Sequence, residues 1–164
     1  MNSSDYRGKV PVGWPGNISR KEGLITEARR VGDTAPSAYG LAVAVNADGD
    51  IIELPTGSAA TVIFGLIIAP EFSTFTPKPE AKIMGDVMRQ GYMTVKVASG
   101  APSANSAVYV RVSNASGEHP LGEINAAPVT ETSLRTVVMV GARFVGPSTA
   151  ANDGTLIAEI AFNL

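Results

Sequence analysis

The sequence predicts an all-β domain, either a compact β-barrel or a β-sandwich of short antiparallel strands. The first observation is that 17 Gly and 11 Pro in 164 residues supply turns throughout the chain. The second is that 45% of the residues are hydrophobic but only 6% are aromatic, so small and β-branched residues dominate, and β-branched residues favour strands. The third is a series of short apolar–polar alternations separated by turn residues, which is typical of sandwiches and barrels.

The clearest alternation lies between residues 85 and 112. Successive side chains of a strand face opposite sides of a sheet, so alternate apolar residues mark a buried face. Two such sets occur here: Met93, Val95 and Val97, and then Val108, Val110 and Val112. Between them, Gly100 and Pro102 lie in a cluster of turn-forming residues. The stretch therefore predicts two strands joined by a loop, around which the rest of the chain is organised.

Further strands are expected on both sides of this stretch. They fall at residues 24–28, 41–45, 51–54, 61–69, 136–145 and 156–162. Asp48-Gly49 separates the second and third of these strands, which indicates a hairpin turn with φ > 0 at Gly49. Gly65 and Gly141 interrupt two of the apolar runs. A glycine inside a strand marks a bulge or a close approach of two backbones.

Two segments are candidate interfaces. Residues 1–23 are polar and rich in Gly and Pro, so they predict an extended N-terminal arm that precedes a barrel or sandwich domain at residues 24–164. Residues 70–79 form a Pro-rich loop whose aromatic rings either fold back onto the core or make a protruding contact loop. The apolar and aromatic residues of these two segments are the candidate interface residues: Val10, Val12, Trp14, Ile18, Phe72 and Phe75.

The charge, the lengths of the apolar runs and the lack of cysteine argue against several kinds of partner and chemistry. The net charge is −2 without a basic run, and nucleic-acid affinity depends on clustered Lys and Arg, so no nucleic acid is expected. No apolar run approaches the ~18 residues of a membrane-spanning helix, so no membrane partner is expected. With no Cys there is no disulfide or thiol chemistry. The N-terminal residues hold no apolar signal sequence, so we expect synthesis in the cytoplasm.

The sequence offers no catalytic or metal-binding pattern. His119 is the only histidine and lies in a polar loop, so we expect it to be solvated. Residues 46–50 contain two Asp but lack the Glu that closes a calcium-binding loop. Glu53, Glu71 and Glu80 are scattered, and nothing selects a catalytic pair among them. We therefore expect a protein that is not an enzyme and that binds no cofactor and no metal.

Several spaced motifs are shared with one protein family. They are Trp14-Pro15-Gly16, Tyr39-Gly40-Leu41-Ala42-Val43, Phe64-Gly65-Leu66-Ile67, Gly85-Asp86-Val87, Gly91-Tyr92-Met93-Thr94-Val95, Val108-Tyr109-Val110 and Gly141-Ala142-Arg143-Phe144. On these residues, which span the chain from about residue 13 to residue 164, the sequence resembles the structural cement, or capsid-decoration, proteins of tailed bacteriophages. The loop at residues 70–79 departs from the family pattern because it is richer in Pro and Phe.

The resemblance implies a phage head-decoration protein on the outer surface of the capsid in the virion, where it stabilises contacts between capsomers. It implies two partners: the major capsid protein, and further copies of the chain in a homo-oligomer. For that oligomer a trimer is preferred over a dimer. It implies no catalytic residues, in agreement with the missing catalytic patterns.

Two alternatives from other classes stay open at this point. The first is a carbohydrate-binding β-sandwich module of a phage fibre or of a secreted enzyme. Such a module needs exposed aromatic platforms, and this chain has only one Trp and four Tyr to supply them. The second is a small hydrolase that uses a carboxylate pair.

Overall fold

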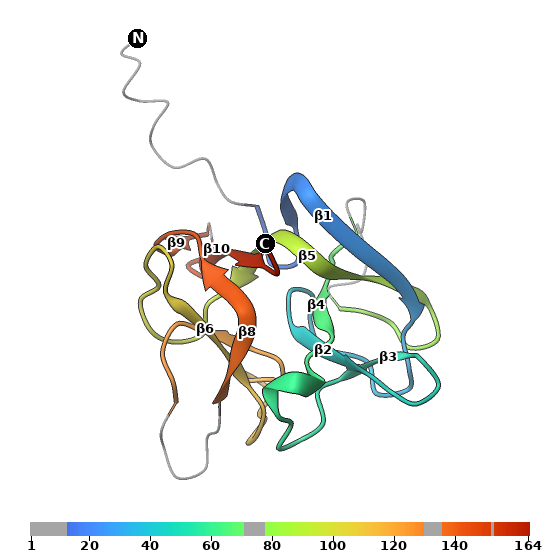
Figure 1. The fold of residues 1–164 in the computed structure, drawn as a ribbon. Coiled ribbons are helices and arrows are strands. Elements are labelled where there is room, and N and C mark those ends of the chain that lie inside the picture. The colour runs from blue at the N-terminus through green and yellow to red at the C-terminus, as the bar shows by residue number, and fades with distance from the viewer. Residues whose placement is uncertain (1–12, 71–77, 130–135, 152) are drawn as a thin grey trace.

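The computed structural model describes residues 13–70, 78–129, 136–151 and 153–164 (Figure 1). The described residues form ten strands and one short 3-10 helix: β1 (Ile18–Arg30), β2 (Ala42–Val45), β3 (Ile51–Glu53), η2 (Ala60–Val62), β4 (Gly65–Ile67), β5 (Met84–Lys96), β6 (Ala107–Arg111), β7 (Ile124–Asn125), β8 (Thr136–Phe144), β9 (Thr149–Ala150) and β10 (Leu156–Phe162). All ten strands join one curled, antiparallel sheet, so the all-β prediction is confirmed. In this part of the chain no helix is long and apolar enough to cross a membrane.

Strand β5 pairs on both of its edges, and the rest of the sheet is arranged along it. Val87, for example, pairs with Glu27 of β1 on one edge and with Ile67 of β4 on the other. Beyond β4, strand β10 pairs with residues 91–96 of β5. The two neighbours separate near Gly91, whose φ of 135° is a conformation that side chains other than glycine rarely adopt. The sheet therefore divides into two halves at Gly91.

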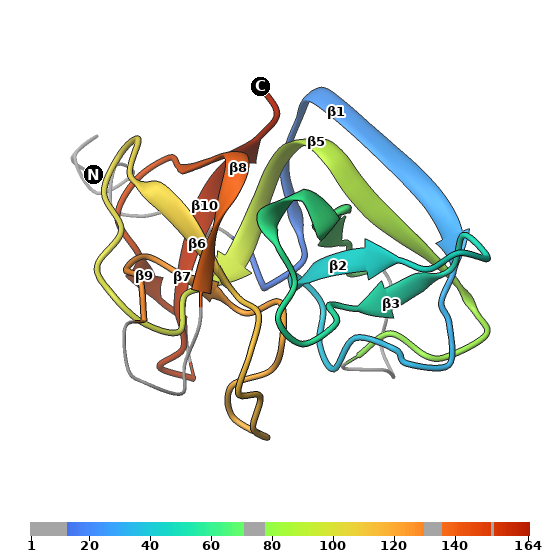
Figure 2. The same ribbon diagram turned by 60° about the horizontal axis from the view of Figure 1, so that its bottom comes forward.

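One isolated parallel β-bridge closes each half of the sheet. The strand order is β3-β2-β4-β5-β10-β8-β6-β7. Val31, directly after β1, bridges to Ile51 of β3, and Val97, directly after β5, bridges to Ile124 of β7. Each end of the sheet thus curls back toward the strands at its centre. Figure 2 shows β1, β2 and β3 on one side of β5 and β6, β8 and β10 on the other.

Two clusters of buried hydrophobic residues form the core. The smaller cluster consists of Val31, Leu41, Val43, Ile51, Ile67 and Val87. The larger cluster takes Leu66 and Met88, neighbours of Ile67 and Val87 that face the other side of the sheet, and continues through β5, β6, β8 and β10. The six alternate residues singled out between residues 85 and 112 all lie in the larger cluster and are at most 3% exposed. The predicted buried faces of β5 and β6 are confirmed.

The hairpin between β2 and β3 forms where the Asp48-Gly49 pair predicts it. Val45 pairs with Ile51 across the turn, and Gly49 has φ = 87°. The Asn46 side chain accepts hydrogen bonds from the N–H groups of Asp48 and Asp50 at 3.0 and 2.8 Å. A hydrogen bond from Arg30 ties Asp50 to β1 and lowers the pKa of the Asp50 carboxyl. The turn is therefore held by its own side chains and by β1.

The observed strands differ from the expected ones in several places: the short strands β7 and β9 were not expected, and two expected strands have other bounds. Residues 61–69 were expected to form one buried strand, but only Gly65–Ile67 is a strand, and it follows the turn of η2. The reason is local: Ile63 N–H donates to Ala60 O, and Gly65 packs so tightly that an added Cβ would lie 2.4 Å from Met88 O. A continuous apolar run carries no period that would reveal such a turn.

The first strand is also longer than the expected segment at residues 24–28. It begins at Ile18, so residues 18–23, which the sequence analysis assigned to the arm, lie in β1. Most of β1 is exposed, and a half-exposed edge strand has no apolar alternation by which it could be recognised. The division of the chain into an arm and a barrel domain stays a prediction.

A buried ion pair joins β6 to the segment before β7. Arg111 Nε donates to Glu123 Oε1 at 3.0 Å, and each side chain is 4% exposed. Asn125 Nδ2 donates to the backbone oxygen of Glu123 at 3.3 Å. His119 Nδ1 lies 2.9 Å from Glu123 Oε2, so the half-exposed histidine is anchored to this pair. Arg111 Nη1 is buried without a hydrogen-bond partner among the described residues.

We expect Gly49→Val to destabilise the protein by about 1–2 kcal/mol, because valine is strained at positive φ. For a chain of this size that corresponds to a fall of several degrees in Tm, measured by circular dichroism. Gly117→Val is the matched control, since a Cβ at Gly117 meets nothing within 4 Å and its φ lies outside the strained range. An unchanged Tm for Gly49→Val would contradict the strained turn.

We expect Glu123→Leu to destabilise the protein by about 3–5 kcal/mol, because it leaves the Arg111 charge buried without its partner. Adding Arg111→Met should recover most of that loss, since a well-packed apolar pair can replace a buried ion pair. The control is Glu118→Leu at an exposed position, with an expected change within about 0.5 kcal/mol. Urea denaturation measures all four proteins, and a double variant no better than Glu123→Leu would refute the pairing argument.

Candidate interaction surface

The structure describes two of the six candidate interface residues. Trp14 is 53% exposed, whereas Ile18 is half-buried and packs against the larger core cluster. Val10 and Val12 lie outside the described residues, as do the two candidates of the loop at residues 70–79, Phe72 and Phe75. As an interface, this set of residues stays a prediction.

Trp14 is held at the surface by a turn that is bonded to the sheet. Asn17 N–H donates to Trp14 O at 3.0 Å, and Gly16 N–H donates to Thr94 O of β5 at 2.9 Å. Ala69 N–H donates to Gly16 O at 2.9 Å. The indole is therefore presented from a rigid position on the body of the protein, which favours its use as a contact residue.

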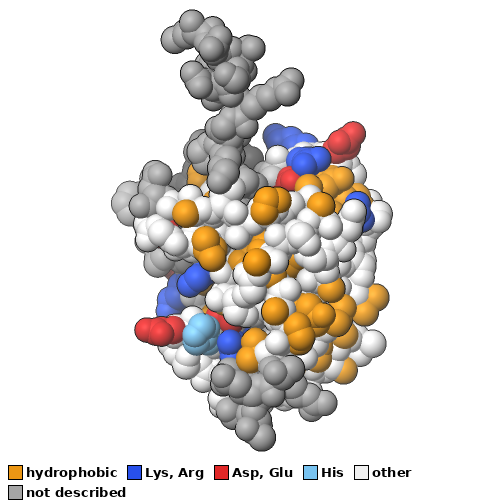
Figure 3. Space-filling view, turned by 90° about the vertical axis from the view of Figure 1, so that its left-hand side faces the viewer, with side chains coloured by type: hydrophobic (Ala, Val, Ile, Leu, Met, Phe, Trp, Pro, Cys, Tyr) orange, Lys and Arg blue, Asp and Glu red, His pale blue; other side chains and the backbone are white. Residues whose placement is uncertain are grey.

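A group of exposed valines, here called the β8 patch, lies on β8 and η2. Val62, Val138 and Val140 are 41%, 46% and 73% exposed, while Met139 between the last two is 1% exposed. Strand β8 lies against η2, so Val62 is carried by an element next to the strand that carries Val138 and Val140. Figure 3 shows the molecule from the side that carries β6 and β9, where hydrophobic side chains lie in several groups among polar atoms. Grouped exposed apolar side chains are typical of protein interaction sites.

A bulge in β8 lies next to Val140, the most exposed of the three valines. Tyr109 of β6 pairs with Val138, but Ala107, two residues away, pairs with Arg143, five residues along β8. Gly141 lies within the bulge with φ = 80°, and its carbonyl oxygen accepts a hydrogen bond of 2.8 Å from the N–H of Asn163. The predicted irregularity at Gly141 is thus present. Sequence reasoning did not identify the patch, because TVVMV reads equally as a buried run.

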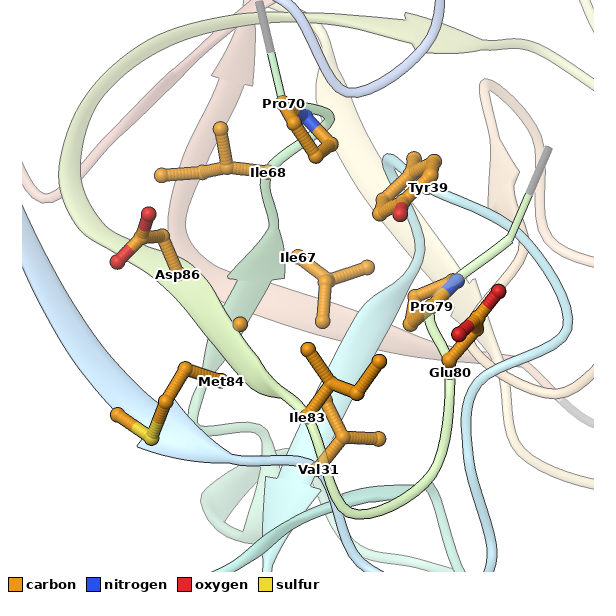
Figure 4. Close-up of a pocket in the computed structure, with 11 residues that line it drawn as sticks. Val31, Tyr39, Ile67, Ile68, Pro70, Pro79, Glu80, Ile83, Met84 and Asp86 are labelled. Carbon is orange, nitrogen blue, oxygen red and sulfur yellow. The ribbon is translucent and has the colours of Figure 1, made fainter. Parts of the chain in front are cut away.

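A second candidate surface is the β4–β5 pocket, a cavity of about 200 Å³. It is lined by Val31, Tyr39, Ile67, Ile68, Pro70, Pro79, Glu80, Ile83, Met84, Gly85 and Asp86. Figure 4 shows these side chains around the cavity, from the end of β1, the segment before β2, β4 and the start of β5. Its lining is mainly apolar, with two carboxylates.

The described residues give no support to a catalytic or metal centre. They include no group of three or more His, Asp and Glu side chains that could hold a metal ion. Burial raises the pKa of the Glu53 carboxyl, but desolvation alone accounts for the shift and no second carboxylate contributes to it. The contact of His119 with Glu123 belongs to the buried ion pair of the fold.

Two of the described aromatic rings, those of Phe64 and Tyr92, are covered by arginine side chains. The Arg89 and Arg29 guanidinium carbons lie 3.7 and 5.0 Å from the centroid of the Phe64 ring. The Arg20 guanidinium carbon lies 4.6 Å from the centroid of Tyr92. A carbohydrate platform needs an open ring face, so neither ring supports the carbohydrate-binding alternative.

Comparison with known proteins adds the family. Residues 3–161 match the family of the XM1 gp53 minor capsid protein. Among solved structures, the fold is similar to a chain of "The capsid of Myoviridae Phage XM1", with a TM-score of 0.67 and 19% sequence identity over 92% of this chain and 91% of that chain. A search of the curated proteins finds no match. The expected resemblance to capsid-associated proteins of tailed phages is confirmed, and the chain belongs to the XM1 gp53 minor capsid protein family.

Proposed function

We propose that this protein decorates the outer surface of a phage capsid and acts there as a structural cement between neighbouring capsomers. Membership of a minor capsid protein family supports a role on the capsid. The β8 patch is the observation that carries the assembly of copies on the shell, because a folded domain that exposes apolar side chains is suited to bind another protein chain. No enzymatic role is proposed.

The physical task of such a protein is to add contact area across the seams of a shell. Packaged genome presses outward, and the seams between capsomers carry the load. A net charge of −2 gives little long-range steering toward the shell. Burial of apolar surface therefore supplies most of the binding free energy, and the many copies on one shell multiply a modest contribution from each.

We assign the β8 patch to the contact between copies of the chain. It consists of valines alone, and apolar surface is characteristic of interfaces within homo-oligomers. A closed symmetric oligomer, with a trimer preferred over a dimer, presents several shell-binding surfaces at once. Binding to the major capsid protein is then multivalent, which raises the overall affinity without any new type of contact.

We expect Val140→Glu to weaken self-association at least tenfold, because it places a charge in the centre of an apolar contact. Folding should be unaffected, since Val140 is 73% exposed. Sedimentation over a concentration series measures the dissociation constant. Ile25→Glu is the control, a similarly exposed apolar residue on β1. A wild-type protein that is monomeric at micromolar concentration would refute the self-association itself.

The function is tested by adding the purified protein to capsids that lack it and counting bound copies per shell. We expect saturable binding on the outer surface, visible by cryo-electron microscopy, and several-fold weaker binding for Trp14→Ala, because the exposed indole is lost as a contact. Trp14→Phe is the control, since it keeps an aromatic ring. Absence of bound wild-type protein would refute the decoration role, and equal binding by Trp14→Ala would remove Trp14 from the interface.

A further inference from the structure

The β4–β5 pocket has a buried apolar floor and an open apolar rim. Val31 and Ile67 at the floor are 2% and 0% exposed, whereas Ile83 and Met84 at the rim are 53% and 64% exposed. Benzene fits an engineered apolar cavity of about 150 Å³, so a volume of about 200 Å³ has room for one apolar side chain. An apolar cavity that opens at the surface is suited to receive a side chain of another protein.

Backbone hydrogen bonds hold the walls of the pocket in place. Val31 N–H donates to Ile83 O at 2.8 Å, and Ile68 N–H donates to Asp86 O at 2.8 Å. Gly40 N–H donates to Ile67 O at 2.9 Å, which fixes the segment before β2. A cavity with walls tied in this way is preformed, so binding costs little ordering of the protein.

Two carboxylates flank the cavity without partners of their own. Glu80 and Asp86 are exposed lining residues, and Figure 4 shows them on opposite sides of the apolar side chains. Neither carboxylate forms an ion pair or a hydrogen bond with another described residue. Lys78 and Lys82 are close in sequence but do not line the cavity, and the Lys82 ammonium lies 3.6 Å from Asp33. A partner that carries a cation beside its apolar side chain therefore complements both parts of the site.

The cavity lies next to the turn that carries Trp14. A Cβ on Gly16 would be 2.7 Å from the Cβ of Tyr39, which lines the cavity. The carbonyl oxygen of Gly16 accepts a hydrogen bond of 2.9 Å from Ala69 N–H, next to the lining residue Pro70. Trp14 is two residues from Gly16, a backbone span of at most about 7 Å. The Trp14 turn and the cavity are thus neighbours, and they share no residue with the β8 patch.

We propose that the β4–β5 pocket receives one apolar side chain of the major capsid protein, from a shell segment with a Lys or Arg next to that side chain. The apolar side chain enters the cavity, the cation faces Glu80 or Asp86, and Trp14 contacts the shell beside it. This inference rests on the proposed decoration function and deepens it, because it names the surface that meets the shell and the chemistry of the shell segment. The β8 patch stays free for the contact between copies.

Site-specific crosslinking on capsids tests this assignment, because the chain has no native Cys. Met84→Cys, at the pocket rim, carries a short thiol-reactive diazirine and is bound to capsids that lack the protein. Val140→Cys is the control, since it is at least as exposed and lies on the β8 patch. After irradiation, we expect at least tenfold more crosslinking to the major capsid protein from the Met84 position than from the Val140 position.

Mass spectrometry of the crosslinked peptides tests the chemistry of the partner. The crosslinked shell segment should contain a Lys or Arg within about two residues of an apolar side chain. Crosslinks from the Met84 position to the same chain or to another copy would overturn the proposal, and so would a shell segment without a cation. Ile83→Cys replaces Met84→Cys if that variant fails to fold or the attached group blocks binding.

The two carboxylates are tested by charge reversal. Glu80→Lys with Asp86→Lys should weaken binding to capsids at least tenfold, whereas Glu22→Lys with Glu118→Lys makes the same change in net charge at exposed positions elsewhere and should leave binding within about twofold. Glu80→Gln with Asp86→Asn replaces the first pair if circular dichroism shows that it does not fold, with several-fold weaker binding expected.

The two levels of the argument fail in different ways. Wild-type protein that does not bind capsids would refute the decoration function, and this inference with it. Wild-type protein that binds, with equal binding by the pocket and control pairs, would overturn the pocket as the shell contact and leave the decoration function standing.

Discussion

The pairing of β5 on both of its edges is the constraint on which the rest of the structure depends. A strand of 13 residues offers backbone donors and acceptors along two edges, and buried groups of this kind need partners. Strand β1 supplies one edge, but β4 has only three residues, so the other edge is completed by β10. Gly91 permits the change of neighbour, because its positive φ turns the backbone where β4 ends and β10 begins. The two curled halves and their separate core clusters follow from that division.

The sequence was most informative where one face of a strand is buried and a turn has its own chemistry. Strand β10 matches the expected residues 156–162, and Gly49 has the expected positive φ. It was least informative where tertiary contacts decide the conformation. Residues 18–23 look like a polar arm, yet Ile18 and Arg20 pair with β5. Arg111 and Glu123 look like surface charges, yet they are buried against each other. Local pattern cannot show either, since both depend on neighbours far away in the chain.

The candidate interaction surfaces were the hardest feature of the structure to predict from the sequence. The predicted interface residues were chosen for their aromatic or apolar character in polar segments, and this choice found Trp14. The β8 patch arises because β8 exposes Val138 and Val140 beside η2, and the pocket arises from four separate segments that meet. The patch lies in the half of the sheet with β8, and the pocket lies in the half with β4. One chain therefore offers two candidate surfaces, one with exposed valines and one with two carboxylates at an apolar cavity.

The pairing of β5 with β10, a strand much later in the sequence, also affects how the chain folds during synthesis. Residues 91–96 of β5 emerge from the ribosome well before those of β10, so one edge of the central strand stays unpaired while β6, β7, β8 and β9 are synthesised. An open edge next to apolar residues is a template for pairing with other chains. Contacts so distant in sequence also slow folding. The chain must then complete its sheet after β10 is synthesised, in competition with mispairing between nascent chains.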